Sequence, residues 1–302
     1  MKKLLLLLIL TPVCALQAQQ WGDLVHAMSY NVRHCAGMDD QVNVSRVSRV
    51  IRTEDPDIVA VQELDSMCTR SGSVYQLQQM SVLTRLKPTF AKAIPFGGGS
   101  YGVGILSKVL PLSVKRVPLP GKEPRVLLIC EFETYVFACT HLDLVEENRM
   151  ASIPIILAEA ERFDKPFIMA GDWNDAPTTN FMKELRKSFK PMNMAFLPTF
   201  PADKPTTCID YIAYYIPNGQ VRVGTSKVIN EPLASDHRPI TCDFHSSYVP
   251  DGINSLRRDG VTNGPERIID LSGRIVSGDD APWKQQQGRL YKKSAKGTVI
   301  IR

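Results

Sequence analysis

The chain has 302 residues, 44% of them hydrophobic, which is enough to bury the core of one large domain with a small addition. Its formal net charge is +5, from 36 basic and 31 acidic residues. When Lys2, Lys3 and the ten basic and six acidic residues after position 250 are set aside, 24 basic and 25 acidic residues remain. The large domain therefore lacks the basic composition typical of proteins that bind duplex DNA through many phosphates, although composition leaves room for a local basic patch.

The first 18 residues are predicted to be a signal peptide. Two lysines precede the apolar run at 4–10, and the segment Ala-Leu-Gln-Ala at 15–18 is typical of a cleavage site. The run is too short to serve as a mature membrane helix. Cys14 raises the alternative of a lipid anchor, but Val13 before it fits such a site poorly. We therefore expect an exported protein that is periplasmic, at the cell surface or extracellular.

Residues 19–245 read as one continuous α/β unit, whose first half alternates strands with helices. Helix-spaced apolar residues at 42–54 are followed by Asp55 and Pro56, which predicts a helix that ends there. The short β-branched run at 57–64 predicts a buried strand. Strands are also expected at 24–32 and 102–106, and a second helix at 75–86.

The second half is richer in strands, with a predicted antiparallel pair at 126–132 and 135–140. A helix rich in Ile, Leu and Ala is expected at 148–163, with Pro154 in about its first turn, where proline is tolerated. Further elements are a strand at 167–170, a short helix at 181–189 and closing strands at 209–215 and 240–244. Because some strands are linked by crossovers and others by hairpins, the order suits two sheets packed face to face with helices outside.

Residues 246–302 differ from the rest of the chain and read as a linker followed by a short C-terminal appendage. The segment begins rich in Gly, Asp and Asn, and a short strand is expected at 298–301. It contains no motif of residues that could catalyse a reaction or bind a metal, so we expect no second catalytic domain there.

Six cysteines remain after the predicted signal peptide, and export would place them in an oxidising compartment. None has the Cys-x-x-Cys spacing of a zinc site. A bridge between Cys35 and Cys68 is one interpretation, since each follows a predicted strand by a few residues, and Cys130 and Cys139 flank the predicted hairpin. Buried free thiols are the alternative, because a domain of this size needs no disulfide.

Short polar motifs stand where the predicted strands end. Open α/β sheets bind their ligands at such ends, and carboxylate and amide oxygens are ligands that Mg²⁺ prefers. A single polar residue of this kind is usually a solvent-facing strand end or a turn, but several in equivalent positions favour a site for a divalent metal and a phosphate ester. The motifs are MSYNV with Asn31, VQELD with Glu63, THLDL with His141, GDWND with Asp172 and Asn174, CIDYI with Asp210, and SDHRP with Asp236 and His237.

Two of these motifs carry the sharpest signal. Asp172 and Asn174 lie two residues apart after a glycine, so an extended segment would point both side chains to the same side. The alternative is an ordinary polar turn. Asp236 next to His237 can bind a metal or orient the imidazole, which titrates near neutral pH. Asp210 is a candidate to hold an imidazole in one tautomer, or else a residue of the turn before its strand.

The ordered set of motifs resembles the endonuclease/exonuclease/phosphatase superfamily, typified by deoxyribonuclease I, over residues 24–245. GDxN followed by SDHxP is the specific part of the resemblance. It implies an α/β fold, a four-layer sandwich of two packed mixed β-sheets with helices on the outer faces, and a phosphoesterase that depends on Mg²⁺, with Mn²⁺ as an alternative. The roles it implies are Glu63 as the main metal ligand with Asn31 nearby and Asp236 at the metal, Asp172 as the group that positions or deprotonates water, Asn174 and His141 as phosphoryl-binding groups, and His237, oriented by Asp210, as the group that stabilises the transition state.

The resulting hypothesis is an exported phosphoric ester hydrolase, and a phosphodiesterase in particular, that acts by in-line attack of water. Arg33 stands where the base-excision nucleases of the superfamily carry an acidic residue, which speaks against DNA repair. The substrate stays open between nucleic acid, a phospholipid headgroup and a soluble phosphate ester, since it depends on loop shape. We expect a monomer with no obligate protein partner. The alternative is a non-catalytic surface-binding module that kept the fold, and a zinc hydrolase is disfavoured because the chain has no HExxH motif.

Overall fold

The computed structural model describes residues 21–218 and 221–246 continuously, and five short strands between residues 268 and 301. The predicted signal peptide and the alternative anchor at Cys14 lie outside the described residues. The chain divides into two units between Pro250 and Asp251. The second unit contains the pair β13 (Ile268–Ile269) and β14 (Ile275–Val276) and the antiparallel strands β15 (Trp283–Gln286), β16 (Arg289–Ser294) and β17 (Gly297–Ile301). The strand predicted at 298–301 is confirmed as β17.

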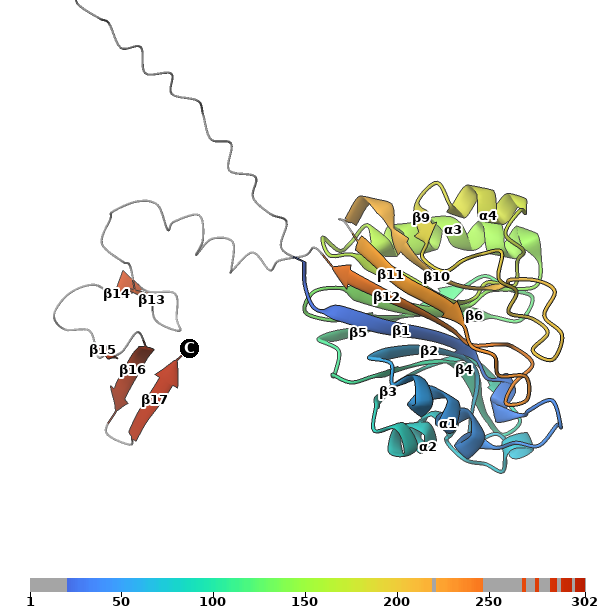
Figure 1. Ribbon diagram of the computed structural model, residues 1–302, viewed down its shortest axis with the longest axis horizontal. Helices are drawn as coiled ribbons and strands as arrows, with labels where there is room; N and C mark the ends of the chain where they lie inside the picture. The colour runs from blue at the N-terminus through green and yellow to red at the C-terminus, as the bar shows by residue number, and fades with distance from the viewer. Residues whose placement is uncertain are drawn as a thin grey trace, which may run out of the picture. The chain divides into compact units, whose positions relative to one another are not determined.

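The first unit is built on two six-stranded mixed sheets (Figure 1). The first sheet has the order β11-β12-β1-β2-β4-β3, and its strands are β1 (Leu24–Asn31), β2 (Ile58–Ser66), β3 (Lys87–Phe96), β4 (Gly99–Ser107), β11 (Val221–Val228) and β12 (Ile240–Ser246). The second has the order β5-β6-β7-β8-β10-β9, and its strands are β5 (Ser113–Leu119), β6 (Arg125–Glu131), β7 (Val136–His141), β8 (Phe167–Asp172), β9 (Phe189–Pro191) and β10 (Asp210–Tyr215).

Both sheets share one pairing pattern, in which a central parallel pair is flanked by antiparallel neighbours. β1 and β2 are parallel in the first sheet, and β7 and β8 are parallel in the second. Each parallel pair is joined by a crossover helix, α1 (Val44–Glu54) in the first sheet and α3 (Glu146–Ala160) in the second. The carboxyl ends of parallel strands lie at the same edge of a sheet, so each sheet brings two strand ends together there.

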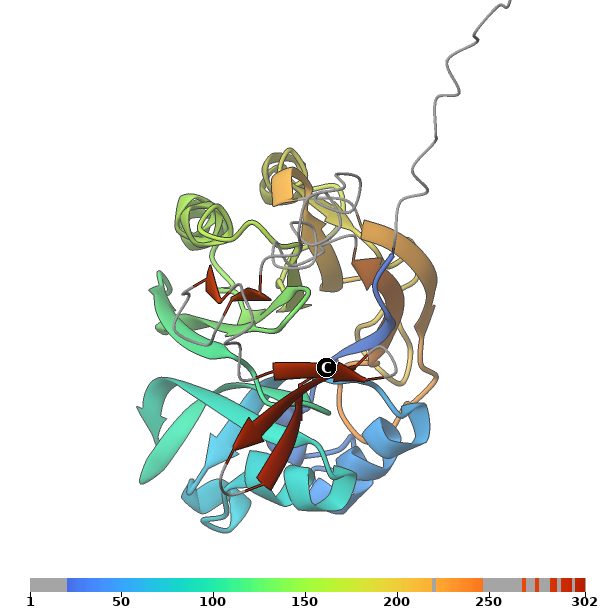
Figure 2. The ribbon, with the colours of Figure 1, turned by 90° about the vertical axis from the view of Figure 1, so that its left-hand side faces the viewer.

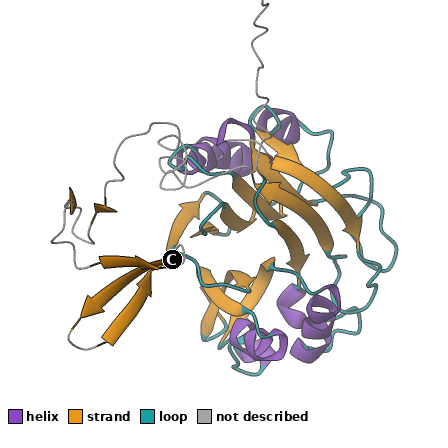
Figure 3. Cartoon of the chain, turned by 60° about the vertical axis from the view of Figure 1, so that its left-hand side comes forward, coloured by secondary structure: helices purple, strands orange, loops and turns teal. Residues whose placement is uncertain are grey.

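The helices cover the outer faces of the two sheets (Figures 2 and 3). α1 and α2 (Gln76–Thr84) pack on the first sheet, and α3 and α4 (Asn180–Leu185) pack on the second. A third apolar cluster, drawn from both sheets, fills the space between them. The predicted four-layer sandwich is therefore confirmed. No helix in the described part of the chain is long and apolar enough to span a membrane.

α1 illustrates how local sequence sets an element. The side chain of Asn43 accepts the backbone N–H of Arg46 and caps the first turn. Val47 and Ile51 lie four residues apart, on one face of the helix, and both are fully buried against the sheet. Asp55 ends the helix in the left-handed conformation, with a φ of 47°.

Sequence reasoning missed four strands, and all four are edges of the two sheets. These strands are β3, β5, β9 and β11, and the helix predicted at 181–189 ends at Leu185 before the chain enters β9. An edge strand has one neighbour and buries little of its surface, so its apolar residues alternate weakly. In β5, for example, only Val117 and Leu119 are buried.

The expected position of Pro154 at the start of its helix is wrong. α3 begins at Glu146, so Pro154 lies well inside the helix. Proline has no backbone N–H, and the carbonyl of Met150 therefore lacks its helical partner. Pro154 is exposed, so this break in the helical hydrogen bonding lies on the side where water can satisfy the free carbonyl.

All six cysteines of the described residues are free and buried. The bridge between Cys35 and Cys68 is not formed, and the alternative of buried thiols holds. Cys68 instead directs its thiol at the carbonyl oxygens of Phe96 and Ser100, at 3.2 and 3.3 Å. Burial raises the pKa of the Cys35 thiol, which keeps this group protonated and unreactive.

Candidate active site

The polar residues at the strand ends meet at one edge of the sandwich, where the core between the sheets ends. Alternate residues of β7 and β8 belong to that core, and His141 and Asp172 continue the two series at the strand ends. The same alternation places Asn31, at the end of β1, and Asp210, at the start of β10, on the inner faces of their strands. Asp172 is the register partner of both His141 and Asp210. Strand parity therefore gathers four of the predicted side chains.

Glu63 reaches this edge through an irregularity in β2. Asn31 pairs with Gln62, whose amide nitrogen lies in the inter-sheet core 3.3 Å from the sulfur of Cys139. A regular strand would turn the next residue, Glu63, toward the helix-covered face. The register between β2 and β4 shifts at this point, and Glu63 has a φ of 60°. This left-handed conformation costs a non-glycine residue on the order of 1–3 kcal/mol, which is typical of functional sites.

Asn31 links the two halves of the site. Its amide nitrogen donates to Glu63 Oε1 at 2.9 Å and to Asp172 Oδ2 at 3.0 Å, so one side chain contacts carboxylates from both sheets. Its amide oxygen accepts the backbone N–H of Arg33 at 3.1 Å. In this orientation the oxygen is held by the backbone, and the role of Asn31 as a metal ligand stays a prediction.

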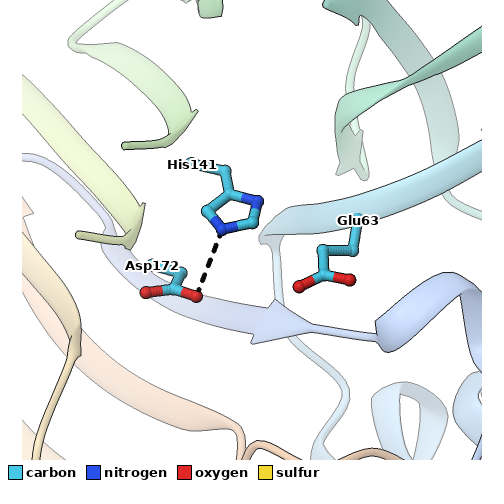
Figure 4. Close-up of side chains that lie close together, drawn as sticks. All are labelled: Glu63, His141 and Asp172. Carbon is cyan, nitrogen blue, oxygen red and sulfur yellow. Dashed lines mark ion pairs between the residues drawn. The ribbon is translucent and has the colours of Figure 1, made fainter. Parts of the chain in front are cut away.

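His141 and Asp172 lie side by side, and Glu63 points toward the same space (Figure 4). His141 Nε2 is 3.5 Å from Asp172 Oδ2. The backbone N–H of Asn174 donates to Asp172 Oδ1 at 2.8 Å, while its side-chain amide donates to the carbonyl of Leu142 at 2.9 Å. Asn174 therefore fixes the Asp172 carboxylate through its backbone, and its role as a phosphoryl-binding side chain stays a prediction.

There is a steric reason for a glycine at the position before Asp172. Gly171 has a φ of 154°, and a Cβ at this position would lie 1.9 Å from the carbonyl oxygen of Thr140 on the neighbouring strand. Any side chain there would push β7 and β8 apart. Gly171 is thus required for His141 and Asp172 to lie opposite each other in the sheet.

His237 lies between two buried carboxylates. Its Nδ1 is 3.0 Å from Asp210 Oδ2, and its Nε2 is 3.6 Å from Asp172 Oδ2. Thr199 donates its hydroxyl to the same oxygen of Asp210 at 2.5 Å. The ring of Phe200 packs against the imidazole, with 4.8 Å between ring centroids. Asp210 therefore contacts His237 in the way that an orienting role requires.

Burial changes the proton affinity of the two carboxylates nearest the site. Removal from water raises the pKa of Asp172 well above its usual range, because the charged form loses hydration, and nearby Asp210 adds to this effect. Burial also raises the pKa of Glu63, and the hydrogen bond from Asn31 offsets part of that rise. Both groups are thus better proton acceptors than ordinary carboxylates.

The two imidazoles are shifted in opposite directions. Burial lowers the pKa of His141 well below its usual value, and the charge of Arg125 adds to the shift. Burial alone would also lower the pKa of His237, but the carboxylates of Asp210 and Asp172 raise it to about 10. At neutral pH His141 is therefore neutral, and His237 carries a positive charge.

Asp236 lies beside the other carboxylates and faces Arg33. Its Oδ2 is 3.7 Å from Arg33 Nε, and its Oδ1 accepts the hydroxyl of Ser235 at 3.3 Å. Among the described residues, two groups of three have ligand atoms within 4.8 Å of one another, and neither includes Asp236. The groups are Glu63, His141 and Asp172, and Asp172, Asp210 and His237. The metal-binding role of Asp236 stays a prediction.

Sequence reasoning did not assign roles to three residues that support the site. Thr199 holds Asp210, and Ser235 donates its hydroxyl to the main-chain oxygen of Asn31 at 2.7 Å. Arg125 is buried, with Nη1 3.3 Å from His141 Nδ1. Ser235 stands in the SDHRP motif and was within reach of sequence reasoning. Thr199 is marked by no local pattern, and its partner lies 11 residues away. Arg125 begins β6, which pairs with the strand that ends in His141, so the predicted hairpin could have pointed to this contact.

A divalent cation fits the donor chemistry of the first group. Glu63 and Asp172 offer carboxylate oxygens of the hard type that Mg²⁺ prefers, within 4.8 Å of a nitrogen of His141. In the described part of the chain, the hydrogen-bond partner of Glu63 is the neutral amide of Asn31. A half-buried carboxylate with a neutral partner is incompletely compensated, and a cation would supply the missing charge. The carboxylate of Glu63 is the group that would hold it, with Asp172 within reach of the same space.

The sequence matches the family model described as "Endonuclease/Exonuclease/phosphatase family" over residues 28–237. The match covers more than half of the chain, and the chain therefore belongs to this family. The predicted family is confirmed. No curated protein matches the sequence.

Solved structures share the fold at low sequence identity. An endonuclease/exonuclease/phosphatase from Bacteroides vulgatus is 18% identical with a TM-score of 0.62, over 74% of this chain and 99% of the other. A mannosyl-6-phosphatase from Bacteroides thetaiotaomicron is 16% identical with a TM-score of 0.59, over 73% of this chain and 99% of the other. ANGEL2, named a 2',3'-cyclic phosphatase, is 14% identical with a TM-score of 0.57, over 74% and 95%. At these identities the likeness establishes the fold alone.

Proposed function

We propose that the protein is a divalent-metal-dependent phosphoric ester hydrolase, with Mg²⁺ as its cation and a phosphodiester as its substrate. The observation that carries the proposal is the convergence of Asn31, Glu63, His141, Asp172 and His237, from both sheets, on one buried edge. Family membership supports hydrolysis of a phosphate ester, and two proteins that share this fold are named for specific phosphatase activities.

The side chains suit in-line attack of water on phosphorus. A divalent cation held by Glu63 would act as a Lewis acid on a phosphoryl oxygen. Asp172 is suited to take a proton from the attacking water, because burial raises its pKa toward the working pH. His237, a cation braced by Asp210, can donate a hydrogen bond to charge that develops on the phosphoryl group. His141 is placed to donate a second one as a neutral imidazole.

A substrate panel tests the proposal. Hydrolysis of bis-p-nitrophenyl phosphate, plasmid DNA, sphingomyelin and inositol phosphates should be measured with Mg²⁺, with Mn²⁺ and with EDTA. We expect turnover of at least one diester with metal and none with EDTA. p-Nitrophenyl phosphate, mannose 6-phosphate and a nucleoside 2',3'-cyclic phosphate belong in the panel because two proteins with this fold are named for phosphatase activities. Turnover of monoesters alone would replace the diesterase assignment with a monoesterase.

The competing function is a surface-binding module without catalysis. Calorimetric titration with Mg²⁺ and Mn²⁺ separates the two, because an enzyme of the proposed kind binds the cation in the absence of substrate. No turnover of any substrate, together with no bound cation, would favour the module. Export is also proposed here, since the predicted signal peptide supports it. Secreted protein whose N-terminal sequence begins at Gln19 would agree with it, and a monomer is expected by light scattering.

A further inference from the structure

Arg125 is a buried cation next to a predicted catalytic imidazole. It begins β6, and its side chain is 7% exposed. Its Nη1 is 3.3 Å from His141 Nδ1 and 3.3 Å from Glu123 Oε1. Its Nε lies 3.8 Å from Asp143 Oδ1 and has no hydrogen-bond partner among the described residues. A buried guanidinium with an unpartnered donor is costly, so a functional reason for this placement is needed.

The surrounding loop fixes Arg125 in place. Asp143, itself 3% exposed, accepts the backbone N–H of Lys122 at 3.0 Å and the side-chain amide of Asn148 at 2.7 Å. These bonds tie the loop before β6 to the segment after β7. The backbone of Gly121 packs close to this side chain, since a Cβ there would lie 3.1 Å from Arg125 Cγ. The guanidinium therefore has little freedom to leave His141.

The chemistry of the guanidinium determines which nitrogen of His141 carries the proton. Arginine has five N–H donors and no acceptor, and it stays protonated in proteins. A ring nitrogen at hydrogen-bond distance from it must therefore offer a lone pair, so Nδ1 of His141 is unprotonated. On the other side of the ring, Nε2 lies 3.5 Å from Asp172 Oδ2, which can only accept when it is ionised. Both neighbours thus select the proton on Nε2.

We propose that Arg125 is a positioning residue that holds His141 as the neutral Nε2–H tautomer, with its N–H directed to the space beside Asp172 Oδ2 where the substrate phosphoryl group would bind. The use of this N–H in hydrolysis rests on the proposed function. The tautomer itself does not, since it follows from the contacts of the ring.

The second imidazole shows why such a device is needed. His237 has a carboxylate on each side, Asp210 at Nδ1 and Asp172 at Nε2, so both of its nitrogens donate and the ring is cationic. His141 would face the same carboxylate of Asp172 and would also be drawn toward the cationic form. The guanidinium at Nδ1 opposes this, because it can only donate and therefore needs an unprotonated nitrogen there. The Nε2 atoms of the two imidazoles thereby lie 3.5 and 3.6 Å from the same oxygen, Asp172 Oδ2, with different partners at Nδ1.

Nitrogen-15 NMR of the histidine rings tests the tautomer directly. The chain has five histidines, so the spectrum of selectively labelled protein is simple, and His141→Asn identifies the His141 signals by their loss. At neutral pH we expect the shift of a bare ring nitrogen for Nδ1 and of a protonated one for Nε2. In Arg125→Met, Nδ1 should move toward the protonated shift, and in Arg125→Lys, which keeps a cation that can only donate, it should move less. Arg222→Met, at an exposed position on β11, is the matched control and should change neither.

Kinetics test the positioning role on the substrate found by the panel. Arg125→Met should lower kcat by about 10- to 100-fold with KM changed less, as for other groups that orient a functional side chain, and Arg125→Lys should recover part of the loss. Protonated Nδ1 in the wild type overturns the tautomer assignment, and wild-type ring shifts in Arg125→Met overturn the role of Arg125 in holding that tautomer. Unchanged kcat in Arg125→Met overturns the positioning role. The NMR is read without substrate, so a protein that hydrolyses nothing would refute the proposed function and leave the tautomer result standing.

Discussion

The two sheets have the same strand pairing, yet they contribute different chemistry to the site. The parallel pair of the first sheet contributes Asn31, at the end of β1, and Glu63, within β2, which offer an amide and a carboxylate. The parallel pair of the second ends in His141 and Asp172, and β10 adds Asp210 beside them. The first pair needs a left-handed residue in β2 to bring Glu63 inward, whereas the second is regular and needs only the glycine before Asp172.

This difference shows that the strand topology determines where the site lies, and that the side-chain chemistry determines which part of the reaction each sheet supports. Both parallel pairs end at the same edge because their strands point the same way. The first sheet supplies a carboxylate whose hydrogen-bond partner is a neutral amide, Glu63, while the second supplies a carboxylate and an imidazole side by side, Asp172 and His141. We therefore expect the first sheet to bind the cation, and the second, together with His237 from the loop before β12, to handle protons and developing charge.

The largest expected effect is a loss of kcat, and it tests whether proton transfer and charge stabilisation are separate from cation binding. Asp172→Ala and His237→Ala should each lower kcat by at least about 10²-fold, since each removes a proton acceptor or a charged donor. His237→Ala should leave the affinity for Mg²⁺, measured by calorimetry, within a few-fold of wild type. His26→Ala is the control, because His26 contacts Asp243 at the opposite end of β1, where both side chains are partly buried. Wild-type turnover in both site variants would refute the roles.

Glu63→Gln tests the first sheet and is expected to act on the cation. It removes the ionised ligand but keeps the shape, so the dissociation constant for Mg²⁺ should rise more than about 10-fold, with part of the activity returning at high Mg²⁺. Glu133→Gln, at an exposed turn between β6 and β7, is the matched control. If Glu63→Gln bound Mg²⁺ normally and lost only kcat, the two sheets would not divide the work as proposed.

Gly171→Ala tests whether the regular geometry of the second sheet depends on this glycine. The added Cβ would meet the Thr140 carbonyl, and the backbone conformation disfavours a side chain. We expect the free energy of unfolding to fall by about 2 kcal/mol or more. Chemical denaturation provides the measurement, and Gly72→Ala is a useful comparison, since its φ is 75° but nothing lies within 4 Å. Equal losses in both variants would mean that the close approach of the strands adds nothing.

The smallest expected effect is a shift in pH dependence. Activity should fall at acid pH as Asp172 takes up a proton, at a pH above the range of an ordinary aspartate because burial raises its pKa. It should fall at alkaline pH as His237 loses its proton, near pH 10. Asp210→Asn removes a charge that raises the pKa of His237, so the alkaline limb of kcat against pH should move to lower pH by about one unit or more. An unmoved alkaline limb would show that another group controls it.

Much of the fold was predictable because its central strands are continuous apolar runs with one polar residue at the end. That pattern located Asn31, His141 and Asp172, whose inward direction follows from counting alternate residues. The inward turn of Glu63 was not predictable from alternation, since a regular strand would direct it outward. The edge strands were missed because they bury too little to leave a pattern. Thr199 was missed because its contact with Asp210 depends on a loop that only the tertiary structure brings close. Arg125 was missed although it begins the strand that pairs with the one ending in His141, because an arginine at the start of a strand is an ordinary feature of a sequence.

The amide of Asn31 contacts one carboxylate on each sheet, and this has a consequence for how activity appears as the chain folds. Neither sheet alone contains a complete set of reacting groups, so a half-assembled chain is inert even if every strand has formed. The rate at which turnover recovers during refolding would then report the docking of the two sheets. Circular dichroism of the backbone does not detect this step.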